Sequence, residues 1–168
     1  GMPDLLLSGQ DDGSNITTRL YRNIGGGDLV PDADVTLPGL HLGEHAWGDV
    51  NGDGFIDVLM TGSPSSKIRM TNLYLNQGGV FSTQSFKFDE LTGSSAAMGD
   101  LDNDGDIDFI AMGISGVEYK MILGINPGQA LHGGTGNFTM RVMDLRPDHP
   151  VSPRAGGELQ GLLDGQIT

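Results

Sequence analysis

Short apolar segments separated by polar turns run through the whole 168-residue chain. Three of them begin with Asp and end with Gly: DLLLSG at 4–9, DVLMTG at 57–62 and DFIAMG at 108–113. Each has the length of a strand, and none continues with the 3.6-residue period of an amphipathic helix. A short apolar run between glycines is typical of a strand buried on both faces. The pattern predicts an all-β protein.

Further strand-like segments follow each of these apolar segments in the same order. The second segments end in Asn and are RLYRN at 19–23, NLYLN at 72–76 and MILGIN at 121–126, the third are FSTQSFKF at 81–88 and FTMRVM at 138–143, and the fourth are HAWG at 45–48 and AAMG at 96–99. One unit therefore holds about four short strands at a period near 50 residues, which fits the blade of a β-propeller. We predict one propeller-type domain over 1–168, with repeats at about 4–56, 57–107 and 108–168.

Composition agrees with this architecture. The chain is long enough for one domain with a real core, and its 28 glycines and 8 prolines suit many tight turns. It contains no apolar run of about 18 residues, so we expect no membrane insertion.

Two acidic loops precede the apolar segments at 57–62 and 108–113. They read DVNGDGFID at 49–57 and DLDNDGDID at 100–108, a spacing of 100 − 49 = 51. Carboxylates this close together repel one another, and a bound cation would offset the repulsion. Calcium takes six to eight oxygens from carboxylates, amides and backbone carbonyls, whereas magnesium prefers fewer protein ligands and keeps its waters. We therefore expect two calcium ions, one in each loop.

The expected ligands occupy positions 1, 3, 5, 7 and 9 of each loop, with the backbone carbonyl acting at position 7. They are Asp49, Asn51, Asp53, Phe55 and Asp57 in the first loop, and Asp100, Asp102, Asp104, Asp106 and Asp108 in the second. Gly54 and Gly105 at position 6 permit the sharp turn. An EF-hand begins similarly, but it needs Glu at position 12, where this chain has Met60 and Ala111.

The net charge of the chain limits the classes of partner that it is expected to bind. The net charge of −13 argues against nucleic acids and anionic membranes. The chain has no cysteine, which excludes disulfides and thiolate metal sites. Its four histidines are scattered and no nucleophile motif accompanies them, so we assign no catalytic residue and do not expect an enzyme.

The acidic loop followed by an apolar strand resembles the FG-GAP and VCBS repeats, which build the β-propeller heads of integrin alpha subunits and of many bacterial surface proteins and lectins. The resemblance implies that calcium is structural and that the same ten residues are its ligands. It also implies an adhesion or ligand-binding module that is extracellular, on the cell surface or periplasmic, where calcium is abundant. The ligand, protein or glycan, is open. Two alternatives also stay open: a carbohydrate-binding lectin, and the scaffold part of a polysaccharide-degrading enzyme.

Both ends of the sequence fall within a repeat. Gly1 and Asp4 align with Gly54 and Asp57, and GLLDGQIT at 161–168 echoes an acidic loop that has lost its ligands. About three repeats cannot close a ring, since propellers have four to eight blades. The chain is then either a fragment of a longer propeller or a protein that assembles. In the second case the strand at 4–8 of one copy completes the last blade of another, and two copies form six blades.

One aromatic residue needs a separate expectation. Trp47 aligns with Met98, because 98 − 47 = 51. We expect it in the core rather than exposed as a platform for sugars.

Overall fold

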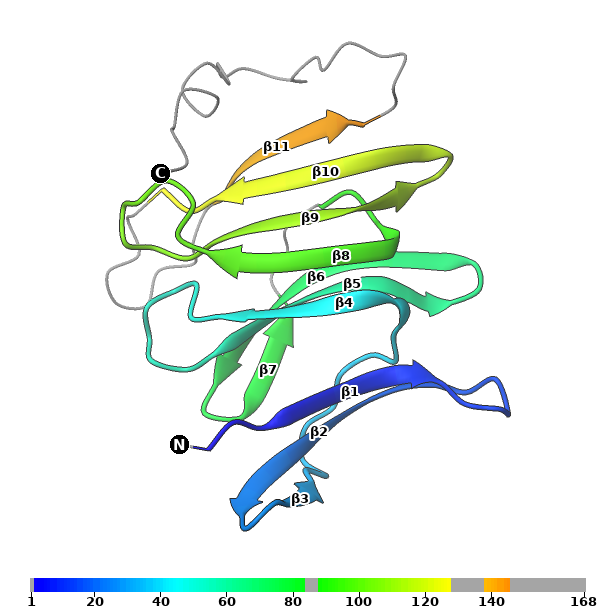
Figure 1. The fold of residues 1–168 in the computed structure, drawn as a ribbon, viewed down its shortest axis with the longest axis vertical. Coiled ribbons are helices and arrows are strands. Elements are labelled where there is room, and N and C mark those ends of the chain that lie inside the picture. Colours follow the sequence, from blue (N-terminus) through cyan, green and yellow to red (C-terminus); the bar gives the residue numbers. More distant parts are fainter. Residues whose placement is uncertain (1, 84–87, 128–137, 146–168) are drawn as a thin grey trace.

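The computed structural model describes residues 2–83, 88–127 and 138–145 (Figure 1). Within these ranges the chain forms eleven strands: β1 (Leu5–Gln10), β2 (Ile16–Gly25), β3 (Asp28–Pro31), β4 (His41–Gly48), β5 (Asp57–Ser65), β6 (Ile68–Gln77), β7 (Val80–Thr83), β8 (Thr92–Gly99), β9 (Asp108–Ser115), β10 (Glu118–Ile125) and β11 (Thr139–Asp144). These residues form no helix, so the all-β prediction is confirmed. Nothing in them qualifies as a helix long and apolar enough to cross a membrane.

The strands form three antiparallel sheets. The first sheet has the order β1-β2-β3, the second β4-β5-β6-β7 and the third β8-β9-β10-β11. The second sheet lies between the other two, and β4 and β8 run side by side at the boundary between the second and third sheets (Figure 1). Successive four-stranded meanders of this kind are the blades of a propeller-like repeat.

Each acidic loop joins the first two strands of a sheet. Gly48 at the end of β4 pairs with Asp57 at the start of β5, and Gly99 pairs with Asp108 in the same way. The sheets therefore begin one strand earlier than repeats counted from residues 57 and 108. Part of the predicted strand at 81–88 (residues 84–87) and the loop-like segment at 161–168 lie outside the described residues.

The strand β5 is buried on both faces, as its apolar sequence predicts. Val58 and Met60 belong to a cluster on the side of the first sheet, which Leu6 of β1 joins. Leu59 between them belongs to the cluster shared with the third sheet. Because side chains alternate along a strand, one short apolar run serves both boundaries.

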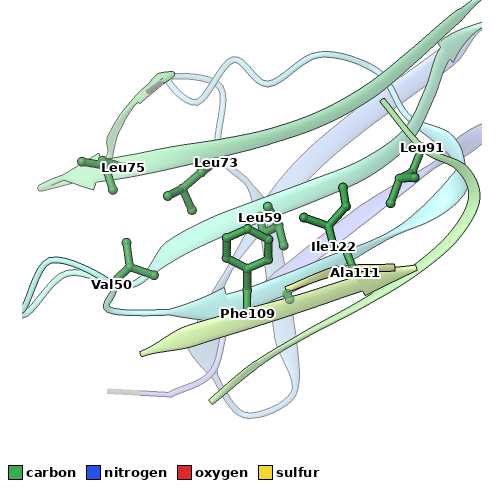
Figure 2. Close-up of a cluster of buried hydrophobic side chains, with 9 residues drawn as sticks. Val50, Leu59, Leu73, Leu75, Leu91, Phe109, Ala111 and Ile122 are labelled. Carbon is green, nitrogen blue, oxygen red and sulfur yellow. The ribbon is translucent and has the colours of Figure 1, made fainter. Parts of the chain in front are cut away.

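The main core fills the boundary between the second and third sheets (Figure 2). Phe109 at its centre is fully buried and meets Phe88 and Phe138 edge-on, with ring centroids 5.3 and 5.2 Å apart. Gly124 pairs with Phe109 across the sheet, and a Cβ at Gly124 would lie 2.2 Å from the Phe109 ring. The ring therefore occupies space that only glycine leaves open.

Two hydroxyl pairs join the second and third sheets beside this core. The Ser94 hydroxyl donates to Thr61 Oγ1 at 2.8 Å, and the hydroxyls of Ser63 and Thr92 lie 2.6 Å apart. Buried hydroxyls need such partners. The second and third sheets are thus joined by directional bonds as well as by apolar contact.

The first sheet departs from the pattern of the other two. Its strands β1, β2 and β3 correspond to β5, β6 and β7, and no described strand corresponds to β4 or β8. One edge of β1 is therefore open in the described chain. Leu5 and Leu7 are 42% and 55% exposed, whereas Val58 and Met60 at the same positions of β5 are fully buried.

The expectation that Trp47 lies in the core is wrong. Its counterpart Met98 packs against Gly48 of the preceding sheet and is half-buried. Trp47 faces the first sheet and lines a cavity together with Leu20 and Arg22 of β2. No described strand of the first sheet lies beside Trp47 as β4 lies beside Met98, and Trp47 remains 40% exposed. Trp47 and Met98 occupy the same position in the repeat, but among the described residues only Met98 has a neighbouring strand that covers it.

Candidate metal centre

Both acidic loops are closed by the carboxylate at position 1. In the first loop Asp49 Oδ1 accepts the Asp53 N–H at 3.1 Å and Oδ2 accepts the Gly54 N–H at 2.9 Å. In the second loop Asp100 accepts from Asp104 and Gly105 at 3.2 and 3.0 Å. The glycine at position 6 has φ +87° in one loop and +95° in the other, a left-handed conformation that non-glycine residues rarely adopt. The predicted turn is therefore present in both copies.

The carboxylate at position 9 is the most deeply buried group of each loop. Asp57 Oδ2 accepts the Val50 N–H at 2.9 Å, and Oδ1 accepts the Asn76 N–H at 2.8 Å. Asp108 makes the corresponding bonds to Leu101 and Asn126, both at 2.7 Å. Each carboxylate therefore ties the loop to the end of the third strand of its own sheet, β6 or β10. Since a carboxylate oxygen can accept more than one bond, these contacts leave lone pairs free to bind a cation.

An asparagine at the end of β6 and another just after β10 are site residues whose role the sequence reasoning missed. Asn76 and Asn126 donate their backbone N–H to Asp57 and Asp108, and the side-chain amide of Asn76 donates to Ile56 O at 3.1 Å. In the first sheet Asn23 makes the same backbone bond to Asp4 at 2.8 Å. The available signal was the repetition of Asn at the same place in all three repeats.

In the second loop three carboxylates converge. Oxygens of Asp100, Asp102 and Asp108 all lie within 4.8 Å of one another, a spacing that could hold a metal ion. Partial desolvation by the loop, together with the nearby charges of Asp104 and Asp108, raises the pKa of Asp102, although its side chain is exposed. Asp104 instead turns Oδ1 to the Asp106 N–H at 3.0 Å.

The first loop has Asn51 where the second has Asp102. Asn51 Oδ1 accepts the Asp53 N–H at 3.1 Å, and its Nδ2 donates to Asp53 Oδ2 at 2.9 Å. Asp53 Oδ1 also accepts the Phe55 N–H at 2.8 Å. Burial raises the pKa of Asp57 to about 6, and the neighbouring charges of Asp53 and Asp49 add to the effect.

Comparison with known families agrees with the geometry. The model of the FG-GAP-like repeat matches residues 49–111, from the start of the first loop into β9. The chain carries an FG-GAP-like repeat. The matched segment includes both acidic loops and the complete unit between them, so the predicted resemblance is confirmed there. The searches of curated proteins and of solved structures found no match.

Proposed function

We propose that the FG-GAP-like repeat of this chain is a calcium-stabilised propeller module that acts in adhesion or ligand binding outside the cytoplasm. The observation that carries the metal part is the convergence of Asp100, Asp102 and Asp108. Hard carboxylate oxygens are the ligands that calcium prefers, and the loop spacing leaves room for a backbone carbonyl at Asp106.

The expected second ion lies in the first loop, held by Asp49, Asn51, Asp53, Asp57 and the Phe55 carbonyl. To take part, Asp53 Oδ2 must exchange the hydrogen bond that Asn51 Nδ2 donates for a contact to the ion, and Asn51 Oδ1, which accepts the Asp53 N–H, must turn to the ion. Among the expected side-chain ligands the first loop also has one carboxylate fewer, Asn51 in place of Asp102, and calcium affinity rises with the number of charged ligands. The second loop should therefore bind calcium more tightly than the first.

Calcium in these loops has a structural role in this proposal. Each loop connects the first two strands of its sheet and is bonded, through the carboxylate at position 9, to the end of the third strand. The ion would neutralise the carboxylates at this junction. We propose no catalytic residues. Millimolar calcium outside the cell would saturate even weak sites, which supports an extracellular, surface or periplasmic location.

The test is the thermal stability of the chain with calcium and with a chelator. A ligand that binds only the folded state raises the melting temperature. Asp102→Ala should remove most of the shift, while Asp12→Ala, an exposed aspartate outside both loops, should keep it. A melting temperature that is indifferent to calcium would overturn the proposal for both loops.

One observation favours a lectin as the second candidate. A cavity of about 550 Å³ lies between the first and second sheets, with Trp47, Phe55, Phe81 and Arg22 among its lining residues. Aromatic faces beside a few polar groups are common in small-molecule sites. Glycan-array binding that disappears in Trp47→Ala would support this candidate.

A further inference from the structure

We propose that the two acidic loops bind calcium cooperatively, because Asn126 transmits the filling of the second loop to the first. This inference rests on the calcium-binding function proposed above and adds a coupling between its two sites. The residues that carry it are deeply buried where the second and third sheets meet. They are Val50, Asp57, Asp108 and Asn126, each at most 3% exposed.

A chain of hydrogen bonds joins the two carboxylates at position 9. Asp108 Oδ1 of the second loop accepts the backbone N–H of Asn126 at 2.7 Å. The side-chain amide of Asn126 donates to the Val50 carbonyl at 2.8 Å, and the Val50 N–H donates to Asp57 Oδ2 of the first loop at 2.9 Å. Asn126 is therefore bonded to both loops at once, although it belongs to neither.

The amide of Asn126 bonds more closely to the preceding loop than to its own. Its equivalent Asn76 donates to Ile56 O, within its own loop, at 3.1 Å. For Asn126 the corresponding distance, to Ile107 O, is 3.4 Å, whereas the bond to Val50 O is 2.8 Å. The shorter of the two bonds is the one that reaches the other loop.

Val50 is placed so that its orientation affects the ligands of the first loop. It occupies position 2, between the expected ligands Asp49 and Asn51. Its carbonyl belongs to the same planar peptide group as the Asn51 N–H. The side chain of Val50 is fixed as well, because it is buried in the main core with Phe109, the residue after Asp108 (Figure 2). The bond from the Asn126 amide therefore helps to orient the ligand at position 3.

An apolar contact between the two loops reinforces this bond. Ile107, at position 8 of the second loop, lies against Gly48, the residue before the first loop, where a Cβ would be 2.7 Å from Ile107 Cγ2. Gly48 pairs with Asp57 across β4 and β5. A shift at position 8 of the second loop is thus transmitted to both ends of the first.

The first loop gains from this support because it must rearrange to bind an ion. Asn51 Nδ2 donates to Asp53 Oδ2, and Asn51 Oδ1 accepts the Asp53 N–H, so two expected ligands are bonded to each other. In the second loop three carboxylates already converge within 4.8 Å. Filling the second loop holds Asp108, and through Asn126 it also holds Val50, which removes part of the ordering cost of the first loop. Repulsion between two dications acts in the opposite direction, so a gain in affinity points to these contacts.

The only tryptophan of the chain allows the first loop to be followed separately. Trp47 precedes Gly48 and lines the same cavity as Phe55 of the first loop. In a calcium titration followed by Trp47 fluorescence, the midpoint should rise about tenfold in Asp102→Ala, which disables the second loop alone. Asp12→Ala should keep the wild-type midpoint. The difference should persist in high salt, which screens exposed charges.

Asn126→Ala tests the route of the coupling. It keeps the backbone N–H that binds Asp108 and loses only the amide bonds, among them the one to Val50. The midpoint for the first loop should already be raised in this variant, and adding Asp102→Ala should raise it little further. Asn23→Ala, which loses an exposed amide bond to Pro3 O, should behave as the wild type. If Asp102→Ala has its full effect in the Asn126→Ala background, Asn126 does not transmit the coupling and the inference is overturned.

Calorimetric titration separates a failure of the coupling from a failure of the proposed function. Asp53→Ala, which disables the first loop, should lower the affinity of the second loop by the same factor by which Asp102→Ala lowers that of the first, because coupling is reciprocal. Two ions bound by the wild type with affinities equal to those of the single-loop variants would overturn the coupling and leave both calcium sites in place. No calcium bound by the wild type would overturn both proposals. This comparison does not use Asn126→Ala, so it stands even where that variant fails to fold.

Discussion

The side-chain amide of Asn126, at the end of β10, donates to the backbone carbonyl of Val50, 76 residues earlier, at 2.8 Å. Asn126 also donates its backbone N–H to Asp108 at 2.7 Å. One buried residue therefore joins the third sheet, its own acidic loop and the loop of the preceding sheet.

Asn126→Ala should destabilise the chain by about 1–3 kcal/mol, because it leaves the buried Val50 carbonyl without its partner. Urea unfolding in calcium-containing buffer measures the change. Asn23→Ala is the matched control, because Asn23 makes the same backbone bond to Asp4 at an exposed site. Equal losses in the two variants would show that the bond between sheets contributes nothing.

Gly124→Ala should cost about 1–3 kcal/mol, since a Cβ there would overlap the Phe109 ring, which has no space to move in the core. The measurement is the unfolding midpoint, with near-ultraviolet circular dichroism to follow the aromatic cluster. Phe109→Leu combined with Gly124→Ala should recover part of the loss. If Gly124→Ala alone is as stable as the wild type, Phe109 does not pack closely on Gly124.

Strands and loops were predictable because their patterns are local. The short apolar run that ends in glycine predicts strand β5, and the spacing of oxygen-bearing side chains along residues 49–57 predicts the turn around Gly54. Where each sheet begins was not predictable, because a repeat of about 51 residues has no absolute starting point. Hydrogen bonding between β4 and β5 supplies it. Trp47 shows the same limit, because its burial depends on a neighbouring sheet that the repeat position does not specify.

The stability of the chain in chelator should depend on the protonation of Asp57. Burial raises its folded-state pKa from 3.8 to about 6, so the folded state holds the proton over a range in which the unfolded state has lost it. The free energy of unfolding should therefore fall as pH rises from about 4 to about 6, by about 2–3 kcal/mol in total. Urea titrations in chelator at half-unit pH steps measure this fall.

His45 provides the internal control for that pH profile. Burial lowers its pKa, so its contribution to stability is lost as pH falls through its unfolded value near 6.5, which is the opposite trend. The difference between wild type and Asp57→Asn isolates the aspartate. Calcium stabilises the ionised carboxylate and should remove the fall. A wild-type profile parallel to that of Asp57→Asn would contradict the raised pKa.

Asn51→Asp should make the first loop resemble the second and change stability in opposite directions with and without calcium. Without calcium, a second carboxylate replaces the amide that donates to Asp53 Oδ2, and repulsion should lower the melting temperature. With calcium, the extra charged ligand should tighten the weaker site by about tenfold, or about 1.4 kcal/mol. Calorimetric titration and paired melting curves measure both effects. Asn103→Asp adds the same charge at position 4 of the second loop, outside the proposed ligands, and should not tighten binding. If Asn51→Asp and Asn103→Asp behave alike, general charge rather than coordination governs calcium binding to these loops.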